Sequence, residues 1–528
     1  MPRWPALKAP TTGTAGAART QERRAHGTGK GVARVGIAAV TGLAWAAAAP
    51  PRGWWFLLPV GVAALAVALR GQGLRMRLSL GGLAGLVFYG LSLRWLTGFS
   101  VLGYFAATVL ETALLAAALG LIPTARAGHG SGGWWTLPAA LVLLEAVQTR
   151  FPFGGFPLSA LAYSQLNGPF VLAAPLGGSL VVTALSAITG VGLAALVLVR
   201  GGWRRVVVVV GTAAALVGVP IAVGAALRTT PVGVLDAAVV QGGGPRGLRA
   251  VFTDPAATTA RTLAAAAQIT GSPDLVVLPE NVVDVTGTIA GTAVDAQIAA
   301  LARKLHASVV VGVVETEGGG FRNAAVLWGP DGQRIGRYEK EHRVPFGEYI
   351  PGRALLERVT DLTALVPRDA IVGRGPALLA SPGAPLGVVI SYEVFFADRV
   401  RSAVDAGGQV ILVPTNASSY TTGEVPAIEV AAARMRAREF GRAVLQAAPT
   451  GYSAIIQPDG TVTTQSGLGE AALLHHSVPL RTGLTPYARA GDLPVIVLAI
   501  IVLAAPVLIR GERRRRERRA AHPPETLP

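Results

Sequence analysis

Long apolar runs are the feature of this sequence that most limits its possible folds. A helix that crosses a bilayer needs about 17–25 mostly apolar residues, and eight stretches approach that length: roughly 31–49, 54–70, 78–97, 101–123, 134–149, 170–199, 206–227 and 493–509. Hydrophobic residues form 51% of the chain and charged residues only 15%, a balance too apolar for an ordinary soluble protein. We therefore expect a polytopic α-helical membrane domain with eight spans, of which the first is retained and not cleaved as a signal peptide.

The positions of the arginines predict how these spans are oriented. Cytoplasmic loops are enriched in Lys and Arg, and the loops after the second, fourth and sixth runs hold Arg70, Arg75, Arg77, Arg126, Arg200, Arg204 and Arg205. The opposite loops hold only Arg52 and Arg150. With a basic tail at each end, this asymmetry predicts cytoplasmic termini and places residues 228–490 outside. The net charge of +17 comes largely from these loops and tails, so it does not predict nucleic-acid binding.

Two acidic residues, Glu111 and Glu145, lie inside predicted spans. Carboxylates within a membrane often have a function. The alternative is that each lies in a polar interior of the helix bundle, paired with Arg94 or another cation. The sequence leaves both interpretations open.

The sequence pattern changes at about residue 228, where short β-branched runs alternate with helical stretches. Turn sequences at 329–332 and 458–460 predict two hairpins. This alternation indicates a layered α/β domain. The expected division of the chain is a basic cytoplasmic tail at 1–30, a seven-span domain at 31–227, an extracytoplasmic α/β domain at 228–490, an eighth span at 491–510 and an Arg-rich cytoplasmic tail at 511–528.

Polar side chains follow three apolar or hairpin segments of the α/β region. They are Glu280 in Leu-Pro-Glu-Asn, Lys340 after a predicted hairpin, and Ser391 after the apolar run 386–390. A carboxylate can take the hydroxyl proton and an ammonium can stabilise the oxyanion that develops on an attacked carbonyl. If one sheet edge brings the three together, they form a nucleophilic site. Spacing alone does not establish that they converge.

The chain contains no cysteine, which excludes disulfides, Cys-ligated metals and a thiol nucleophile. The histidines at 342, 475 and 476 lack metal-ligand spacing and are interpreted as surface residues. Gly242–Gly244 has no following lysine or helix start that would make it a phosphate loop. We therefore expect neither a metal nor a cofactor.

Glu280, Lys340 and Ser391 lie in segments at which the chain resembles the apolipoprotein N-acyltransferases, a family of the nitrilase superfamily. The resemblance covers nearly the whole chain, including the eight-run plan with the α/β domain before the last run. It rests on segments in a fixed order: Phe-Pro-Phe-Gly-Gly-Phe-Pro at 151–157, Val-Val-Gln-Gly at 239–242, Leu-Pro-Glu-Asn at 278–281, the run 338–351, Ser-Tyr-Glu-Val at 391–394, Thr-Asn at 415–416, Arg-Met-Arg-Ala at 434–437 with Glu439 and Arg442, and Thr-Gly-Tyr-Ser at 450–453. The run 338–351 is the most specific of them.

The resemblance implies an αββα sandwich and assigns roles to its residues. Glu280 is the general base, Lys340 stabilises the oxyanion, and Glu348 is a second acid of the site. Position 391 is the nucleophile, and Tyr392 and Glu393 support it. The family forms an acyl-enzyme from a phospholipid acyl chain and passes the acyl group to the α-amine of a diacylglyceryl cysteine. The implied partners are thus a phospholipid donor, a lipoprotein acceptor and the inner membrane of a bacterial cell.

The chain departs from the family at the nucleophile, where Ser391 replaces the usual Cys. A serine hydroxyl is essentially never ionised near pH 7 and depends more on its base. Ser391 could work in a tuned site, act slowly or on a different acceptor, or mark a protein that has lost catalysis. Leu158 and Glu429 also stand where the family commonly has Trp and His. Two other functions remain open at this point: a membrane-anchored amidohydrolase and a catalytically inactive scaffold.

Some of the candidate site residues also have a structural interpretation. Lys340 could be a solvated hairpin residue, although the chain has only three other lysines. Glu280 could begin a helix, and Glu348 could be a surface acid. Tyr392 could be part of a hydrophobic core. Glu393 could be the ion-pair partner of Arg436 or Arg442.

Overall fold

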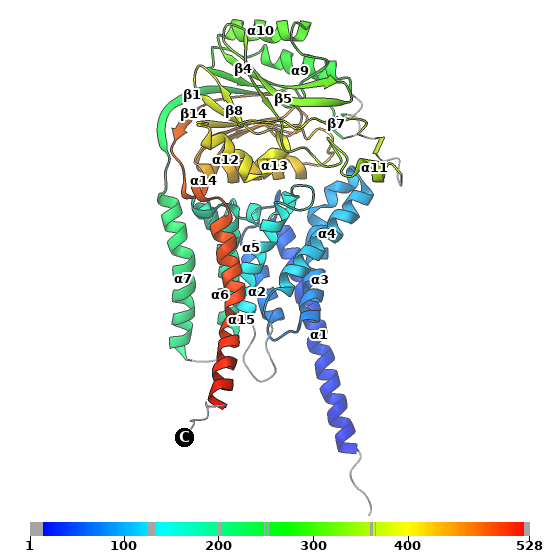
Figure 1. Ribbon diagram of the computed structural model, residues 1–528, viewed down its shortest axis with the longest axis vertical. Helices are drawn as coiled ribbons and strands as arrows, with labels where there is room; N and C mark the ends of the chain where they lie inside the picture. Colours follow the sequence, from blue (N-terminus) through cyan, green and yellow to red (C-terminus); the bar gives the residue numbers. More distant parts are fainter. Residues whose placement is uncertain are drawn as a thin grey trace, which may run out of the picture.

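The computed structural model describes residues 14–123, 133–198, 202–247, 250, 253–358, 363–364 and 366–521. Arg126 and Arg200, which contributed to the predicted orientation, lie outside this part. So do residues 1–13 of the N-terminal tail and residues 522–528 of the C-terminal tail. The molecule has a helical part and an α/β part stacked along its long axis (Figure 1).

A helix overlaps each of the eight predicted apolar runs. These helices are α1 (Thr14–Ala48), α2 (Leu57–Leu69), α3 (Leu74–Ser92), α4 (Val101–Gly120), α5 (Leu137–Gln148), α6 (Ala174–Leu198), α7 (Trp203–Ala226) and α15 (Leu493–Ala521). In the described chain, four segments are long and apolar enough to cross a membrane: Gly31–Ala48, Val101–Gly120, Pro169–Leu198 and Trp203–Ala226. The expectation of eight spans is therefore met only in part.

Local sequence explains why some of these helices are short. The 134–149 run begins with a 3₁₀ turn, η2 (Trp134–Thr136), so α5 spans only twelve residues. The 54–70 run follows two prolines and Gly53, and its helix starts at Leu57. In the 170–199 run, the 3₁₀ turn η5 (Pro169–Ala173) precedes α6, whose backbone kinks at Gly177 and Gly178. Glycine tolerates the left-handed backbone found at Gly178.

The two buried acids of the helical part are not paired with a cation. Glu111 accepts a hydrogen bond from Gln148. Glu145 accepts one from Thr183 and one from the Ala162 backbone N–H at 3.1 Å. Within the described residues no ion pair joins either of them to Arg94, so the suggested pairing is not seen, whereas the polar bundle interior is. Both are held by neutral donors inside the bundle, as a polar bundle interior requires.

The α/β part contains two sheets. The first has the order β14-β1-β2-β4-β5-β6, with β3 paired to β4 and β7 to β5. Its strands are β1 (Thr230–Gln241), β2 (Leu275–Val277), β3 (Val283–Thr286), β4 (Ser308–Glu317), β5 (Gly320–Trp328), β6 (Arg334–Glu339), β7 (Asp369–Ala370) and β14 (Ala472–Thr482). Strands β1, β2 and β4 are parallel neighbours, so their carboxyl ends meet at one edge.

The second sheet has the order β13-β12-β11-β10-β9-β8. Its strands are β8 (Leu378–Ala380), β9 (Pro385–Val388), β10 (Val410–Pro414), β11 (Val444–Ala447), β12 (Ala454–Ile456) and β13 (Val462–Gln465). The central strands β9, β10 and β11 are parallel. Both predicted hairpins are confirmed, since β5 pairs antiparallel with β6 and β12 with β13 across the predicted turns.

Four layers result, with the sheets in the middle. Helices α9 (Pro255–Ala266) and α10 (Ala293–Leu305) cover the first sheet, which is the outer one (Figure 1). Helices α12 (Ala397–Asp405) and α13 (Glu424–Phe440) lie between the second, inner sheet and the membrane helices. Apolar residues of α13 face both neighbours, because the helix packs on α6 as well as on the sheet. This matches the expected αββα arrangement.

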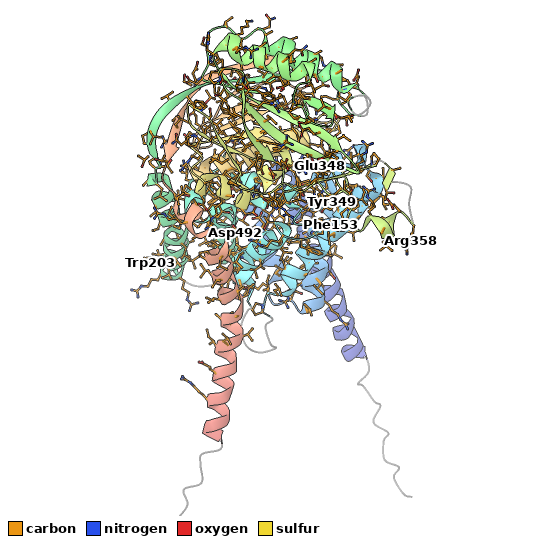
Figure 2. The ribbon with its side chains drawn as sticks, turned by 45° about the horizontal axis from the view of Figure 1, so that its top comes forward. Phe153, Trp203, Glu348, Tyr349, Arg358 and Asp492 are labelled. Carbon is orange, nitrogen blue, oxygen red and sulfur yellow. The ribbon has the colours of Figure 1, made fainter. Side chains whose placement is uncertain are left out.

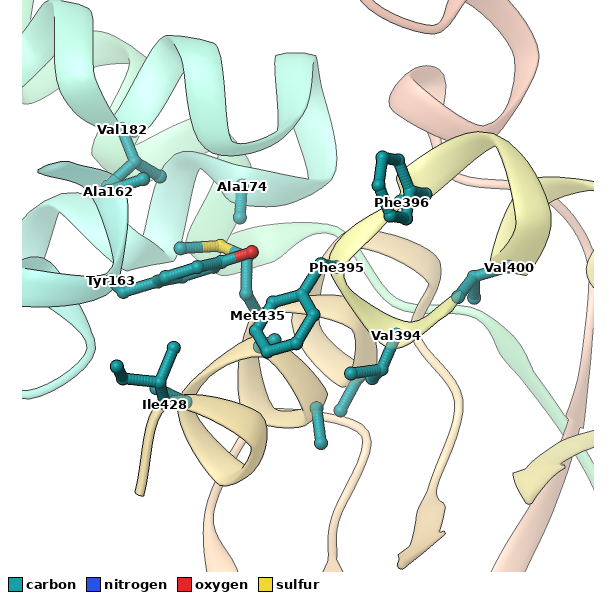
Figure 3. Close-up of a cluster of buried hydrophobic side chains, with 14 of the residues drawn as sticks. Ala162, Tyr163, Ala174, Val182, Val394, Phe395, Phe396, Val400, Ile428 and Met435 are labelled. Atoms are coloured by element: carbon teal, nitrogen blue, oxygen red, sulfur yellow. The ribbon is translucent and has the colours of Figure 1, made fainter. Parts of the chain in front are cut away.

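One hydrophobic core runs from the membrane helices into the α/β part. Figure 3 shows Tyr163 of the helical part beside Phe395, with Ile428 and Met435 of α13 in the same cluster. The rings of Tyr163 and Phe395 have centroids 6.4 Å apart. Phe395 belongs to the 3₁₀ turn η7 (Ser391–Phe395). The segment that begins with Ser391 is therefore packed directly against the helical part.

Candidate active site

Glu280 lies just beyond the end of β2, at the carboxyl edge of the first sheet. The chain leaves the strand through a Leu278 N–H bond to the Val310 carbonyl at 2.8 Å, and Asn281 then adopts a left-handed backbone with φ 56°. Gly312 allows this path, because a Cβ there would stand 2.4 Å from the Glu280 Cα. The Glu280 side chain is thereby placed inside the protein, where the residue is 3% exposed.

Lys340 follows β6 and reaches the same place from another strand. Its backbone N–H bonds to the Asn323 carbonyl at 2.9 Å, which continues the β5–β6 pairing. The Lys340 Nζ lies 2.9 Å from Glu280 Oε1 and 2.8 Å from Glu348 Oε1. Lys340 is 2% exposed, so it is not a solvated hairpin lysine. Two buried carboxyl groups surround one ammonium.

Glu348 is held by the loop 344–349, which folds back on itself. Its Oε2 accepts the Val344 N–H at 2.8 Å, and its backbone N–H bonds to the Val344 carbonyl. Within this loop Phe346 has a left-handed backbone with φ 61°, a conformation that costs energy for a residue with a Cβ. The side chain of Glu348 is 13% exposed, so it is not a surface acid. Figure 2 shows it at the boundary between the two parts of the molecule.

Asn323 of β5 joins this cluster, and the sequence analysis did not identify it. Its Nδ2 donates to Glu280 Oε1 at 2.8 Å and to Glu348 Oε1 at 2.9 Å. The amide therefore holds the same two oxygen atoms as Lys340 without adding charge. The available signal was its place at the start of the apolar run 324–328, where a polar residue pointing inward needs a partner.

Burial and charge act in opposite directions on this cluster. Burial raises the pKa of Glu280, and the Lys340 ammonium opposes that rise. Burial alone would lower the pKa of Lys340, but the charges of Glu280 and Glu348 raise it above its ordinary value. Lys340 therefore stays protonated at neutral pH. A permanently charged donor next to a carboxyl with a raised pKa suits oxyanion stabilisation beside a general base.

Ser391 is the third residue after β9 of the second sheet, following Val389 and Ile390. The observed strand ends at Val388, so the predicted run 386–390 is too long by two residues. Ser391 has a left-handed backbone with φ 49° and is 7% exposed. A strained residue of this kind often marks a functional site. Within the described chain, no hydrogen bond joins its hydroxyl to Glu280 or Lys340, and such contacts often form only when substrate is bound.

Glu393 fastens the turn that carries Ser391 to the segment that carries Lys340. Its carboxylate accepts the Ile390 N–H at 2.7 Å on one side. On the other side it accepts the backbone N–H groups of Glu341 at 2.8 Å and His342 at 3.0 Å, and also the Tyr338 hydroxyl at 2.8 Å. The Arg399 Nε is 3.9 Å away. Glu393 thus fixes the position of the turn.

The alternative partners proposed for Glu393 are wrong. Arg436 pairs with Glu439 at 3.0 Å, one turn further along the same helix. Arg442 donates to backbone carbonyls instead, including that of Gly408 at 2.9 Å. Neither arginine therefore neutralises the Glu393 carboxylate.

Tyr392 and the loop 151–157 connect the site to the helical part. The Tyr392 hydroxyl donates to the Gly155 carbonyl at 2.8 Å, and its ring packs edge-on against Phe396 with centroids 5.1 Å apart. Tyr392 is therefore both a core residue and a link between the two parts. Phe153 of the same loop meets Phe346 with ring centroids 5.7 Å apart, and Figure 2 shows Phe153 beside Tyr349.

Comparison with known proteins identifies this arrangement. Residues 236–484 match the family model of carbon-nitrogen hydrolases, and residues 41–192 match the apolipoprotein N-acyltransferase N-terminal domain. The chain is 30% identical to the apolipoprotein N-acyltransferase of Mycolicibacterium smegmatis, covering 92% of this chain and 87% of that protein. The chain belongs to the apolipoprotein N-acyltransferase family.

Other relatives agree with this assignment. The apolipoprotein N-acyltransferase of Azotobacter vinelandii is 32% identical, over 70% of this chain and 71% of that protein. Among solved structures, an amidase from Nesterenkonia sp. covers 51% of this chain and 96% of its own, with 22% identity and a TM-score of 0.36. As a family member, this protein is an acyltransferase, and its α/β domain matches the carbon-nitrogen hydrolase model.

A third carboxyl group near Lys340 was noted in the sequence only as a departure from the family. Glu429 of α13 is 4% exposed, and its Oε1 accepts the Thr415 hydroxyl at 2.8 Å. Its Oε2 is buried and has no hydrogen-bond partner in the described structure. Burial raises the pKa of Glu429 to about 7, and the charges of Glu280 and Lys340 also act on it. It therefore lies within the electrostatic reach of the cluster.

The histidines are not arranged as metal ligands. His342 is half-buried and stacks on Phe396 with ring centroids 4.5 Å apart, so its interpretation as a surface residue is wrong. His475 lies 2.9 Å from Asp236 on the outer sheet. Across the described residues, no group of three or more His, Asp or Glu side chains could hold a metal ion.

Two cavities flank the site. One of about 430 Å³ is lined by Asn281, Gly347 and Asn416, which neighbour Glu280, Glu348 and Thr415 in sequence. The other, of about 360 Å³, lies between the helical part and the α12–α13 layer and is lined by His342, Phe396 and Arg436, among others. The residues that line these two cavities do not include Glu280, Lys340, Glu348 or Ser391, so the cavities lie beside the cluster and not in it.

Proposed function

We propose that this protein moves a fatty acyl chain from a membrane phospholipid to the α-amine of the diacylglyceryl cysteine at the N-terminus of a lipoprotein. The reaction proceeds through an acyl ester on Ser391. The observation that carries the proposal is the buried Glu280–Lys340–Glu348 cluster. It lies in a layered domain whose nucleophile turn packs directly on membrane helices. Phospholipid and lipoprotein both reside at that boundary.

In the first half of the reaction, the Ser391 hydroxyl attacks the acyl carbonyl carbon. Glu280 takes the hydroxyl proton, and Lys340 stabilises the negative charge that develops on the carbonyl oxygen. The bond between the acyl carbon and the glycerol oxygen then breaks. That oxygen receives the proton from Glu280 and leaves with the lysophospholipid. Glu348 and Asn323 keep the side chains of Lys340 and Glu280 in position throughout the reaction.

In the second half, the acceptor amine attacks the ester carbon and forms the amide bond. The Ser391 oxygen leaves and is reprotonated through Glu280. Tyr392 and Glu393 keep the Ser391 turn in place, since Tyr392 ties it to the loop 151–157 and Glu393 ties it to the Lys340 segment. Because an ester is less reactive toward an amine than a thioester, this half makes the greater demand on the site.

The domain division and topology belong to the same proposal. Residues 31–227 and 491–510 form the eight-span membrane domain, and residues 228–490 form the extracytoplasmic catalytic domain. The tails at 1–30 and 511–528 are cytoplasmic, in the membrane of a bacterial cell. The Arg distribution among the loops supports this orientation. So does the placement of the start of α1 and the end of α15 at the end of the molecule opposite the α/β part (Figure 1).

The test is direct detection of the intermediate. Purified protein incubated with phospholipid should carry an acyl group on the peptide that contains Ser391, measured by mass spectrometry. The adduct should survive neutral hydroxylamine, because it is an ester. Ser391→Ala should carry none and should lose transfer. Ser391→Cys should form a hydroxylamine-sensitive thioester and keep transfer, because a thiol needs less help from the base. Full transfer by Ser391→Ala would contradict the proposal.

A further inference from the structure

Among the buried carboxyl groups that the mechanism above does not use, Glu429 is one on which the charges of Glu280 and Lys340 act. The Oε1 atoms of Glu280 and Glu348 both bond to Lys340 and to Asn323, and Glu348 Oε2 also accepts the Val344 N–H. Glu429 Oε2, by contrast, is buried without a partner in the described structure. A buried polar atom without a partner is costly to maintain, so a ligand that supplies a donor there is to be expected.

The sheet register places this carboxyl group at the level of the nucleophile. Strands β9 and β10 are parallel, and Val388 pairs with Leu412. Ser391 lies three residues beyond Val388, and Thr415 lies three residues beyond Leu412. The Thr415 hydroxyl holds Glu429 Oε1 at 2.8 Å, and α13 packs against η7, which Ser391 begins. Thr415 therefore holds the Glu429 carboxyl group at the edge of the second sheet where Ser391 lies.

The overall reaction releases a proton that Glu280 does not absorb. An α-ammonium carries three protons, whereas the product amide carries one. Glu280 takes one of the two lost protons and returns it to the Ser391 oxygen as the ester bond breaks. The other must leave before attack, because an ammonium has no lone pair. The α-amino group has a pKa of about 7.7–8.0, so most of it is protonated near pH 7.

Building on the function proposed above, we propose that Glu429 binds the acceptor's α-ammonium through its free oxygen and takes that first proton. The steps balance: the ammonium N–H bond breaks and a Glu429 O–H bond forms. The neutral amine attacks the Ser391 ester, the C–N bond forms and the C–O bond to Ser391 breaks. Glu429 then releases its proton to solvent. It is thus a base for the transfer half of the reaction and not for acylation.

The electrostatic surroundings of Glu429 suit this task. Burial raises its pKa to about 7, and among its charged neighbours Glu280 raises the pKa further while Lys340 and Arg246 lower it. Burial and the Glu429 charge together raise the pKa of the neighbouring Tyr420, which stays neutral. A carboxyl group with a pKa about one unit below that of the amine can accept its proton and still release it.

The experiment separates the two halves of the reaction with Glu429→Gln. The protein is loaded with phospholipid in mixed micelles, and lysophospholipid release and Ser391 acylation are measured first. A synthetic diacylglyceryl lipopeptide is then added, and amide formation is followed from pH 6 to pH 9. Acylation should match wild type. Transfer at pH 7 should fall about tenfold, because an amine with a pKa of about 7.7–8.0 is only about one-tenth neutral there without a base, and most of the deficit should disappear at pH 9, where solvent deprotonates the amine.

The control is Glu424→Gln, which removes a carboxylate from the first turn of the same helix, where it accepts the Thr422 hydroxyl at 3.0 Å. It should leave both halves unchanged. If Glu429→Gln does not accumulate, Glu429→His carries the test, because it supplies another base, and it should keep transfer at pH 7 within about threefold of wild type. Equal losses in both halves, or a transfer deficit that is independent of pH, would assign Glu429 a structural role. Wild type that forms no acyl-enzyme would overturn the proposed function as well.

Discussion

Lys340 holds two buried carboxyl groups at once, so its removal should affect both chemistry and stability. In Lys340→Met the oxyanion loses its charged donor, and Glu280 loses the charge that opposes its rise in pKa. We expect transfer at pH 7 to fall at least about 100-fold. Burial raises the pKa of Glu280 in the folded protein above its unfolded value. The neutral carboxyl group therefore contributes to the free energy of unfolding at low pH, and this contribution is lost as the pH rises through the folded pKa.

The stability loss of Lys340→Met should therefore be larger at pH 8 than at pH 5, when thermal unfolding is measured in detergent. Lys304→Met is the matched control, since Lys304 is exposed on α10 and bonds only weakly to the Ala267 carbonyl at 3.4 Å. It should behave as wild type at both pH values. A Lys340→Met protein with normal transfer at pH 7 would remove Lys340 from the mechanism.

At the residue scale, the sequence identified the charged members of the site better than the neutral ones. Glu280 and Lys340 stand out as polar residues after apolar segments, and the resemblance to a known family added Glu348, Tyr392 and Glu393. Asn323 could not be found in this way, because one amide at the start of a strand gives no sign of which carboxylates it will meet. That information resides in the β5–β6 register and in the path of the chain after β2.

At the scale of elements, the loop 151–157 is the connection that can be tested most sharply. The Gly155 carbonyl accepts the hydrogen bond from the Tyr392 hydroxyl. Gly155 has φ 125°, and a Cβ there would meet Thr149 at 2.6 Å and Phe396 at 2.8 Å. Gly155→Ala should therefore displace the loop from η7. We expect at least a tenfold loss of acyl-enzyme formation, measured as lysophospholipid release, because the Ser391 turn loses its anchor.

Gly154→Ala is the matched control for this effect. Gly154 also has a left-handed backbone, with φ 94°, but a Cβ there meets nothing within 4 Å. Both variants bear backbone strain, and only Gly155→Ala adds the clash. Equal losses in the two variants would show that strain alone matters and that the contact with Phe396 does not.

Element types followed from the sequence, whereas element ends did not. The apolar runs located every helix of the membrane part, but the 3₁₀ turns at 134–136 and 169–173 shortened α5 and delayed α6. Hydropathy cannot distinguish a 3₁₀ turn from an α-helix, because both bury the same side chains. Strand β9 likewise ends at Val388 although the apolar run continues to Ile390, since Ser391 enters its turn through those two residues.

At the scale of the whole molecule, α13 determines how the two parts meet. A helix at the surface of an αββα sandwich would normally have a polar outer face. Most of α13 is buried instead, because its outer face packs on α6 and on Tyr163. The catalytic domain is thus seated on the membrane helices through the same layer that carries Glu429.

This seating predicts one orientation, and the absence of native cysteine makes it easy to test. Single cysteines at Gln333, Gly73 and Glu512 would report the α/β part, the α2–α3 loop and the C-terminal end of α15, all at exposed positions. In intact cells a membrane-impermeant maleimide should label only Gln333→Cys. Gly73→Cys and Glu512→Cys should react only after the membrane is permeabilised, because the arginines near both positions favour the cytoplasmic side. Labelling of Glu512→Cys in intact cells would contradict the eight-span arrangement, since an odd number of crossings would then separate the two ends of the chain.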